Sequence, residues 1–308
     1  MPFSNDTVFV TGATGTQGGA LARQLRQLGW GVYAIARDVS SPAARALVDI
    51  GVKLTPGDWE DEETLRTGLA GCDKLFLCLQ SCVEDPPREI RQAKTIISIA
   101  RDAGVTQIVS STSLGVSIYE DEERRSPGTL LHELLDVKNT IEQLVVKSPG
   151  LTSWTLLRPA FFMSNLIKPV INIYTEILEK RRWTTALRPD TRIGLIDHED
   201  IARYAVVAFR DPALFNEQIV NLATDFLTPQ ETMDYLSAAM GVPRIETAFL
   251  SDEEIAAQDP KGLLVQTRCD KSMRFMPDYV DVQMLAQVIP LTTFEKFLVR
   301  EKDNVKRL

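Results

Sequence analysis

The chain has 308 residues, of which 44% are hydrophobic and 25% are charged, as is ordinary for a soluble globular protein. This length is enough to bury a full core and suits one large domain, or a domain with a smaller appendage. The net charge of −8 argues against a nucleic-acid-binding protein, and no apolar run is long enough to span a membrane. The densest basic run, Lys180-Arg181-Arg182, is interpreted as a helix C-terminus.

The cysteines indicate a reducing compartment. They stand at positions 72, 78, 82 and 269 and show no metal-ligand spacing with either histidine, so no metal site is predicted. Scattered thiols without a disulfide framework are typical of such a compartment. The first expected strand starts at residue 7, which leaves no room for a signal or transit peptide. We therefore expect a cytoplasmic protein.

The first half of the chain alternates strands and helices. Strands are predicted at 7–11, 31–37, 52–54, 74–79 and 105–111, with helices between them at 17–28, 42–49, 62–70 and 87–103. A long helix at 129–147 and a strand at 154–158 follow. This alternation predicts the α/β class with a doubly wound parallel sheet.

The second half is less regular. Residues 159–183 are expected to form a loop and a helix, and 198–209 another helix, while 192–196 and 218–222 are expected as strands that return to the sheet. Capping boxes at Thr228–Glu231 and Ser251–Glu254 predict helices in the tail. We therefore predict a sheet domain from 1–158, to which 192–222 returns. A smaller, mostly helical lobe from 159–191 and 223–308 is expected to leave a substrate cleft against the sheet.

A glycine turn follows the first strand directly. Gly12 permits the tight turn, Gly15 lets the backbone approach a pyrophosphate, and Gly18 lets the next helix pack against the sheet. The helix N-terminus offers free N–H groups to the anion. A strand, a glycine turn and a helix in this order predict a Rossmann-type dinucleotide site, to which Thr14, Thr16 and Gln17 also contribute. The alternative is a glycine turn that binds nothing.

The spacing Gly12-x-x-Gly15-x-x-Gly18, within Gly12-Ala13-Thr14-Gly15-Thr16-Gln17-Gly18-Gly19, resembles that of the NmrA-like branch of the atypical short-chain dehydrogenases. Leu156-Leu157-Arg158-Pro159-Ala160-Phe161-Phe162-Met163-Ser164-Asn165 resembles the R-P-x-x-F-M-x-N segment of the same family. The family contains reductases and redox-sensing regulators. The resemblance implies that Pro159 and Phe161 approach the nicotinamide of a bound cofactor.

The second strand ends where dinucleotide-binding proteins select their cofactor. Ala36 occupies the position of the usual carboxylate and Arg37 follows it directly, and an arginine accommodates the 2′-phosphate of NADP. We therefore predict NADP(H) as cofactor. The alternative is that Arg37 only pairs with Asp38 or faces solvent.

Two further segments are expected beside the cofactor. Gly57-Asp58-Trp59-Glu60-Asp61 resembles the family's G-D-x-x-D turn. This implies that Asp58 lies by the adenine amino group and that Trp59 flanks the ring. Asp61 is expected instead as the N-cap of the next helix, and Leu79, which ends the fourth strand, is expected beneath the ADP-ribose.

The catalytic residues are harder to assign, because no tyrosine in the chain has a lysine four residues later. Lys138, in a K-x-x-x-E pattern that resembles the family's, is expected to bond the nicotinamide ribose, or else to form an exposed pair with Glu142. His132 lies six residues earlier, about 120° away around a helix, and lines the site only if that helix begins late; otherwise it caps the helix start. Ser111 offers a hydroxyl at the end of the fifth strand, where a carbonyl substrate is expected.

These observations predict an NADPH-dependent reductase of a carbonyl, a quinone or a conjugated small molecule, with a flat, apolar substrate. An alternative is a non-catalytic NADP(H)-sensing regulator that binds a protein partner. A non-redox isomerase or dehydratase is a minor third reading. The sequence leaves open whether the protein forms a homodimer.

Overall fold

The computed structural model describes residues 6–259 and 264–305, which form two compact units. The first unit takes in the chain up to Thr112 together with 137–158 and 201–220. The second comprises 113–136, 159–200 and the chain from Asn221 onward. The domain boundaries expected from the sequence stay a prediction, and they differ from these units chiefly in the assignment of 113–136.

The first unit is built on a seven-stranded sheet with the order β10-β6-β5-β4-β1-β2-β3. Its strands are β1 (Thr7–Val10), β2 (Gly31–Ala36), β3 (Lys53–Pro56), β4 (Lys74–Leu77), β5 (Gln107–Ser111), β6 (Ser153–Pro159) and β10 (Gln218–Leu222). Strands β1 to β6 pair in parallel, with Phe9 opposite Tyr33 on one side and Leu75 on the other. The strand order reverses at β1, so the carboxyl ends of β1 and β4 form a topological switch point. The predicted α/β doubly wound sheet is confirmed.

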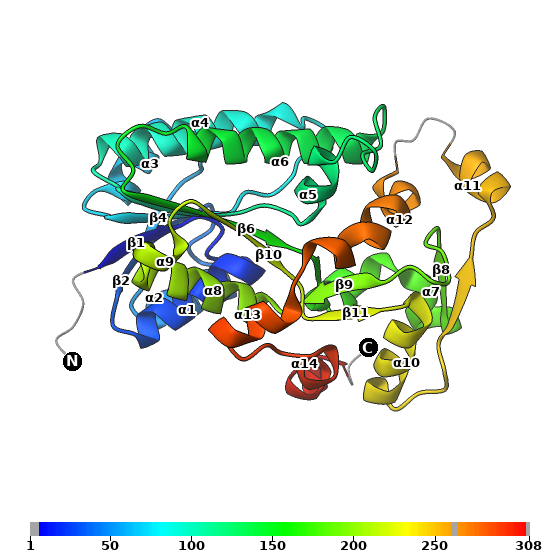
Figure 1. Cartoon of the computed structure of the whole chain (residues 1–308). Coiled ribbons are helices and arrows are strands. Elements are labelled where there is room, and N and C mark those ends of the chain that lie inside the picture. The colour runs from blue at the N-terminus through cyan, green and yellow to red at the C-terminus, as the bar shows by residue number, and fades with distance from the viewer. Residues whose placement is uncertain (1–5, 260–263, 306–308) are drawn as a thin grey trace. The chain divides into compact units, whose positions relative to one another are not determined.

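Helices cover both faces of this sheet. They are α1 (Thr16–Gln27), α2 (Pro42–Asp49), α3 (Glu62–Leu69), α4 (Pro87–Asp102), α6 (Leu130–Val146), α8 (His198–Arg210) and α9 (Pro212–Phe215). Figure 1 shows α3, α4 and α6 on one face, and α1, α2 and α8 on the other. Buried apolar side chains such as Phe9, Leu75 and Ile96 fill the layer under α3, α4 and α6. Asp61 caps α3 as predicted, accepting hydrogen bonds from the amides of Glu63 and Thr64.

The second unit mixes short helices with two small sheets. Its helices are α5 (Gly115–Glu120), α7 (Thr175–Lys180), α10 (Pro229–Met240), α11 (Asp252–Gln258), α12 (Val265–Phe275), α13 (Val282–Val288), α14 (Phe294–Arg300) and α15 (Lys302–Val305). The strands are β7 (Phe161–Phe162), β8 (Arg182–Thr185), β9 (Ile193–Ile196), β11 (Asp225–Leu227) and β12 (Glu246–Phe249), in the orders β11-β9-β7 and β12-β8. Both predicted capping boxes are confirmed, at the starts of α10 and α11. Helix α7 ends at Lys180, as the basic run predicted.

Strand β9 corrects one expectation. Residues 192–196 were expected to return to the large sheet together with 218–222, but only β10 does so. Strand β9 instead pairs in parallel with β7 and antiparallel with β11, and all four of its residues are buried. Strand β11 follows β10 after only two residues, so it supplies a nearby partner whose backbone groups satisfy those of β9.

Neither a membrane span nor a metal cluster is present in 6–259 and 264–305. No described helix combines the length and the apolar character needed to cross a bilayer. Within the same residues, no group of three or more His, Cys, Asp or Glu side chains is placed to hold a metal ion. All four cysteines are free thiols.

Candidate functional site

The glycine turn lies between β1 and α1. Gly12 has φ +64°, a left-handed conformation that favours glycine, and Gly15 is the N-cap of α1 without a side-chain cap. A Cβ added at Gly18 would lie 2.4 Å from the carbonyl oxygen of Gly12, closer than real Cβ contacts come. A Cβ at Gly15 would meet only that same oxygen, at 3.2 Å. Gly18 is therefore required for packing, whereas Gly15 borders open space at the helix N-terminus.

Hydrogen bonds connect this turn to the ends of β4 and β5. The hydroxyl of Ser111 donates to Gln17 Oε1 at 2.7 Å, and Gln17 Nε2 lies 3.4 Å from Cys78 Sγ. The amide of Cys78 donates to Thr11 Oγ1 at 2.7 Å. Burial raises the pKa of the Cys78 thiol to about 11, so this thiol stays protonated and unreactive at neutral pH. Ser111 and Gln17, both predicted site residues, are thus brought together.

Arg37 extends from the end of β2 and is highly exposed, with 83% of its side chain accessible. Its carboxylate neighbour is Asp58, at 4.0 Å, and not Asp38, while its exposure agrees with the other part of the alternative, in which Arg37 faces solvent. The Asp38 carboxylate accepts hydrogen bonds from the backbone and hydroxyl of Ser40, which hold the pKa of Asp38 below its usual value. Arg37 and Asp58, both predicted cofactor residues, therefore lie side by side. Trp59 packs partly buried against the core of the first unit.

Lys138 contacts two groups at the carboxyl end of β4. Its ammonium donates to the carbonyl oxygen of Leu79 at 3.1 Å. It also donates to Oε1 of Glu89, a residue in the first turn of α4. The Glu89 side chain is 1% exposed and that of Lys138 is 12% exposed. The second carboxylate oxygen, Glu89 Oε2, is buried and has no hydrogen-bond partner among the described residues. Glu89 was not predicted as a site residue, because an acidic residue in the first turn of a helix is common wherever the helix dipole favours it.

Glu142, the other residue of the K-x-x-x-E pattern, binds elsewhere. The alternative of an exposed Lys138–Glu142 pair is wrong, because Glu142 is buried against β6. Its carboxylate accepts hydrogen bonds from the guanidinium of Arg158 and, at 2.5 Å, from the hydroxyl of Thr112. This buried pair holds α6 against β5 and β6, and so fixes the part of the helix that carries Lys138.

His132 lies in the second unit. Its ring is 4.9 Å from that of Tyr119, and Tyr119 donates a hydrogen bond to Asp136 at 2.5 Å, which raises the pKa of Tyr119. It does not cap the helix start, because the hydroxyl of Thr129 accepts from the His132 amide. Helix α6 already begins at Leu130, so His132 and Lys138 belong to one continuous helix and the rotation of about 120° between them stands.

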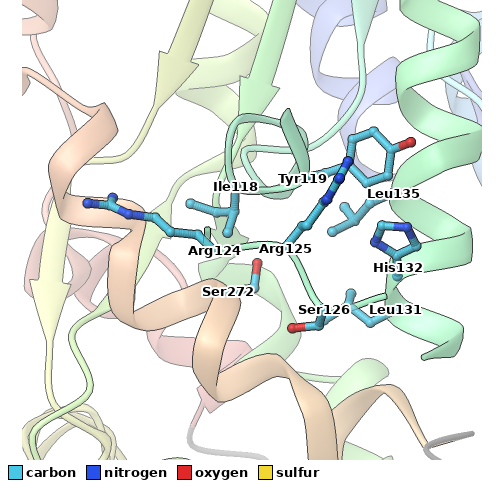
Figure 2. A pocket seen from close by; sticks show the side chains of 9 residues that line it. All are labelled: Ile118, Tyr119, Arg124, Arg125, Ser126, Leu131, His132, Leu135 and Ser272. Atoms are coloured by element: carbon cyan, nitrogen blue, oxygen red, sulfur yellow. The ribbon is translucent and has the colours of Figure 1, made fainter. Parts of the chain in front are cut away.

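Figure 2 shows His132 in a small pocket of the second unit. The lining side chains are Ile118, Tyr119, Arg124, Arg125, Ser126, Leu131, His132, Leu135 and Ser272. The empty space in it is about 240 Å³, part of which is open solvent, so the pocket is not an enclosed cavity. The predicted catalytic role of His132 stays a prediction.

Pro159 and Phe161 also belong to the second unit. The carbonyl oxygen of Pro159 accepts from the amide of Leu114 at 2.9 Å, and Phe161 in β7 pairs with Leu195 in β9. The approach of these two residues to a nicotinamide stays a prediction.

Comparisons with known proteins find similarity to NmrA-like proteins and to NAD(P)H-dependent reductases. A family model, that of the NmrA-like family, matches residues 4–289. The NAD(P)H azoreductase of Xenophilus azovorans is 29% identical over 256 residues, which are 83% of this chain and 82% of the azoreductase.

Two solved structures share the fold. NmrA, a negative transcriptional regulator in complex with NADP, has a TM-score of 0.73 at 18% identity, over 97% of this chain and 98% of its own. The triphenylmethane reductase of Citrobacter sp., complexed with NADP(H), has a TM-score of 0.71 at 20% identity, over 96% and 99%.

Proposed function

The chain belongs to the NmrA-like family, and from that premise we propose that it is an NADP(H)-dependent reductase of small molecules. The observation that carries the proposal is the placement of Lys138. Its ammonium is held at the carboxyl end of β4, the strand next to β1, which leads into the glycine turn. In doubly wound sheets this switch point is where a dinucleotide and its substrate bind. The relationship to an NAD(P)H azoreductase supports the same reaction class.

The residues of the first unit fit a dinucleotide. The N-terminus of α1 lacks a side-chain cap, and a Cβ at Gly15 would fill space that a pyrophosphate needs. The exposed guanidinium of Arg37 would bind the 2′-phosphate bidentately. Asp58 and Trp59 would flank the adenine, and Leu79 would lie beneath the ribose. When bound, the reduced nicotinamide supplies a hydride.

The chain's own contribution to the reaction is orientation and positive charge. The Lys138 ammonium would donate a hydrogen bond to the cofactor ribose and favour negative charge that develops on a nearby substrate oxygen or nitrogen. The Ser111 hydroxyl is oriented by Gln17 and keeps lone pairs for a water or a substrate group. Since no tyrosine stands four residues before Lys138, water would deliver the proton in its place. Pro159 and Phe161 would border the nicotinamide and favour a flat, apolar carbonyl, quinone or conjugated substrate.

One observation favours a second candidate, a non-catalytic NADP(H)-sensing regulator that binds a protein partner. The residue four positions before Lys138 on α6 is Leu134, which cannot deliver a proton. The fold is also that of a transcriptional regulator solved with NADP. A sensor of this kind needs different affinities for the oxidised and reduced cofactor, because a ligand that binds two states equally shifts nothing.

The test is NADPH oxidation by the purified chain with and without added quinones, aldehydes, enones and azo compounds. A reductase oxidises NADPH only when an acceptor is present. Silence across that panel, together with a several-fold difference in affinity between NADP⁺ and NADPH, would favour the sensor instead.

A further inference from the structure

The Lys138–Glu89 pair has unused hydrogen-bonding capacity on both sides. An ammonium carries three donors, and Lys138 directs two of them at Leu79 and Glu89, which leaves one N–H without a partner among the described residues. On the other side, Glu89 Oε2 is a buried acceptor without a partner in the same part of the chain. Burying such an oxygen unpaired is costly, so a group that donates to it is expected in the working state.

A hydroxyl group meets both needs at once. It can accept a hydrogen bond from the Lys138 ammonium through its oxygen and donate its own proton to Glu89 Oε2. Neither a carboxylate nor a phosphate does this, because they offer no proton to Glu89 and are repelled by its charge. The pair is also neutral as a whole, which suits an uncharged ligand group. The pair lies beside the end of β4, at the switch point where doubly wound sheets bind dinucleotides, and Lys138 is the residue predicted to bond the nicotinamide ribose.

We propose that Glu89 is a positioning residue of the cofactor site, which fixes the Lys138 ammonium and accepts a hydrogen bond from a hydroxyl of the bound cofactor. This inference rests on the proposed NADP(H)-binding function and extends it to a residue on α4. Glu89 acts through Lys138 and through the cofactor, and it does not touch the reacting atoms. No redox or proton-transfer step is assigned to it.

The charges around Lys138 define what a change at Glu89 does. Glu142, one turn further along α6, is neutralised by Arg158, and the Cys78 thiol, directly after β4, is protonated. Glu89 is thus the anion that pairs with the Lys138 ammonium. Replacing it with glutamine removes this counter-charge, so the ammonium loses the contact that holds it in place.

The decisive experiment is a double-mutant cycle on NADPH affinity, measured by fluorescence titration of the wild type, Glu89→Gln, Lys138→Met and the double variant. We expect each single change to weaken NADPH binding about tenfold, the scale of a hydrogen bond to a charged group. The double variant should lose less than the sum of the two single losses, because Glu89 acts partly through the ammonium. Glu62→Gln, an equal charge change on the exposed face of α3, is the matched control and should leave affinity unchanged.

The outcomes separate this inference from the function on which it rests. A wild type that binds neither NADPH nor NADH overturns both. If the wild type binds NADPH and Glu89→Gln binds it as tightly as Glu62→Gln does, only the inference is overturned. Glu89 is then a structural core residue, or its free oxygen binds a water molecule. If Glu89→Gln does not fold, Glu89→Asp retains the charge but withdraws the carboxylate, and the same loss of affinity is expected. Failure of both variants to fold would assign Glu89 to stability alone and would also overturn the inference.

Discussion

Arg158 on β6 and Glu142 on α6 form a two-pronged ion pair in which both side chains are almost completely buried. Arg158 Nε donates to Glu142 Oε1 at 3.1 Å, and Nη2 donates to Oε2 at 2.6 Å. The pair fixes α6 one turn beyond Lys138. It also removes Glu142 as a partner for Lys138, whose ammonium instead binds Glu89. The two charged residues of the K-x-x-x-E pattern therefore serve different purposes.

Breaking this pair should unfold the protein more easily. In Glu142→Gln the buried Arg158 guanidinium loses the charge of its Glu142 partner, and the free energy of unfolding should fall by about 3–5 kcal/mol. Urea denaturation followed by circular dichroism measures the loss. The exposed pair of Glu62 with Arg66 provides the control, since Glu62→Gln should change stability little. Equal losses in the two variants would show that the buried pair has no special role.

The glycine turn should separate folding from binding. Gly18→Ala places a methyl group against the Gly12 carbonyl and should lower stability by about 1–3 kcal/mol, the usual cost of overpacking. Gly15→Val should remain folded but lose nucleotide binding, because its side chain occupies the expected pyrophosphate position. Thermal unfolding and calorimetric titration with NADPH distinguish the two. Tight NADPH binding by Gly15→Val would mean that the turn is only structural.

Cofactor preference should depend on Arg37. The wild type is expected to bind NADPH more tightly than NADH, and Arg37→Ala should remove about 1.5–3 kcal/mol of NADPH binding while leaving NADH nearly unaffected. Because Arg37 is highly exposed, the fold should be unchanged. Arg66→Ala, an exposed arginine on α3, is the control. Equal affinity of the wild type for the two cofactors in calorimetry would contradict this assignment.

Stability should fall in mild acid because of His198. Burial lowers the pKa of His198 below its ordinary 6.5, although Asp197 and Glu199 partly oppose the shift and Arg300 adds to it. Below pH 6.5 the unfolded chain then binds a proton that the folded chain does not, so this contribution to stability is present above pH 6.5 and declines as the pH falls. In His198→Gln the decline should be shallower. If the free energy of unfolding changes equally in the two proteins between pH 5 and pH 8, the range in which histidine titrates, His198 is not the cause of the decline.

The parts of this fold that could be predicted are those determined by residues close together in the sequence. The turn at Gly12 and the caps at Asp61 and Thr228 depend on neighbouring residues, and the structure confirms each of these elements. Strands β8 and β12 were not predicted, because charged and polar residues such as Arg182 and Glu246 weaken their pattern and their pairing spans distant parts of the chain.

In the candidate site, too, the residues within a local pattern could be predicted and the contacts between distant segments could not. Lys138 stood out because it lies in a recognisable pattern, but its partner Glu89 is 49 residues away and has no pattern of its own. Only the packing of α4 beside α6 brings the two together. The alternative of a Lys138–Glu142 pair was wrong for a related reason, because Arg158 on β6, distant in sequence from Lys138, binds the Glu142 carboxylate.

The account is tested most directly by the steady-state rate of NADPH oxidation, measured with the best acceptor from the panel for the wild type and for Lys138→Ala. We predict acceptor-dependent turnover by the wild type and a loss on the order of 10²-fold or more in kcat for Lys138→Ala, with the variant still folded. The proposed reductase function would be contradicted by a wild type that binds NADPH but does not oxidise it with any acceptor of the panel. A Lys138→Ala variant that turns over as fast as the wild type would contradict the role of Lys138.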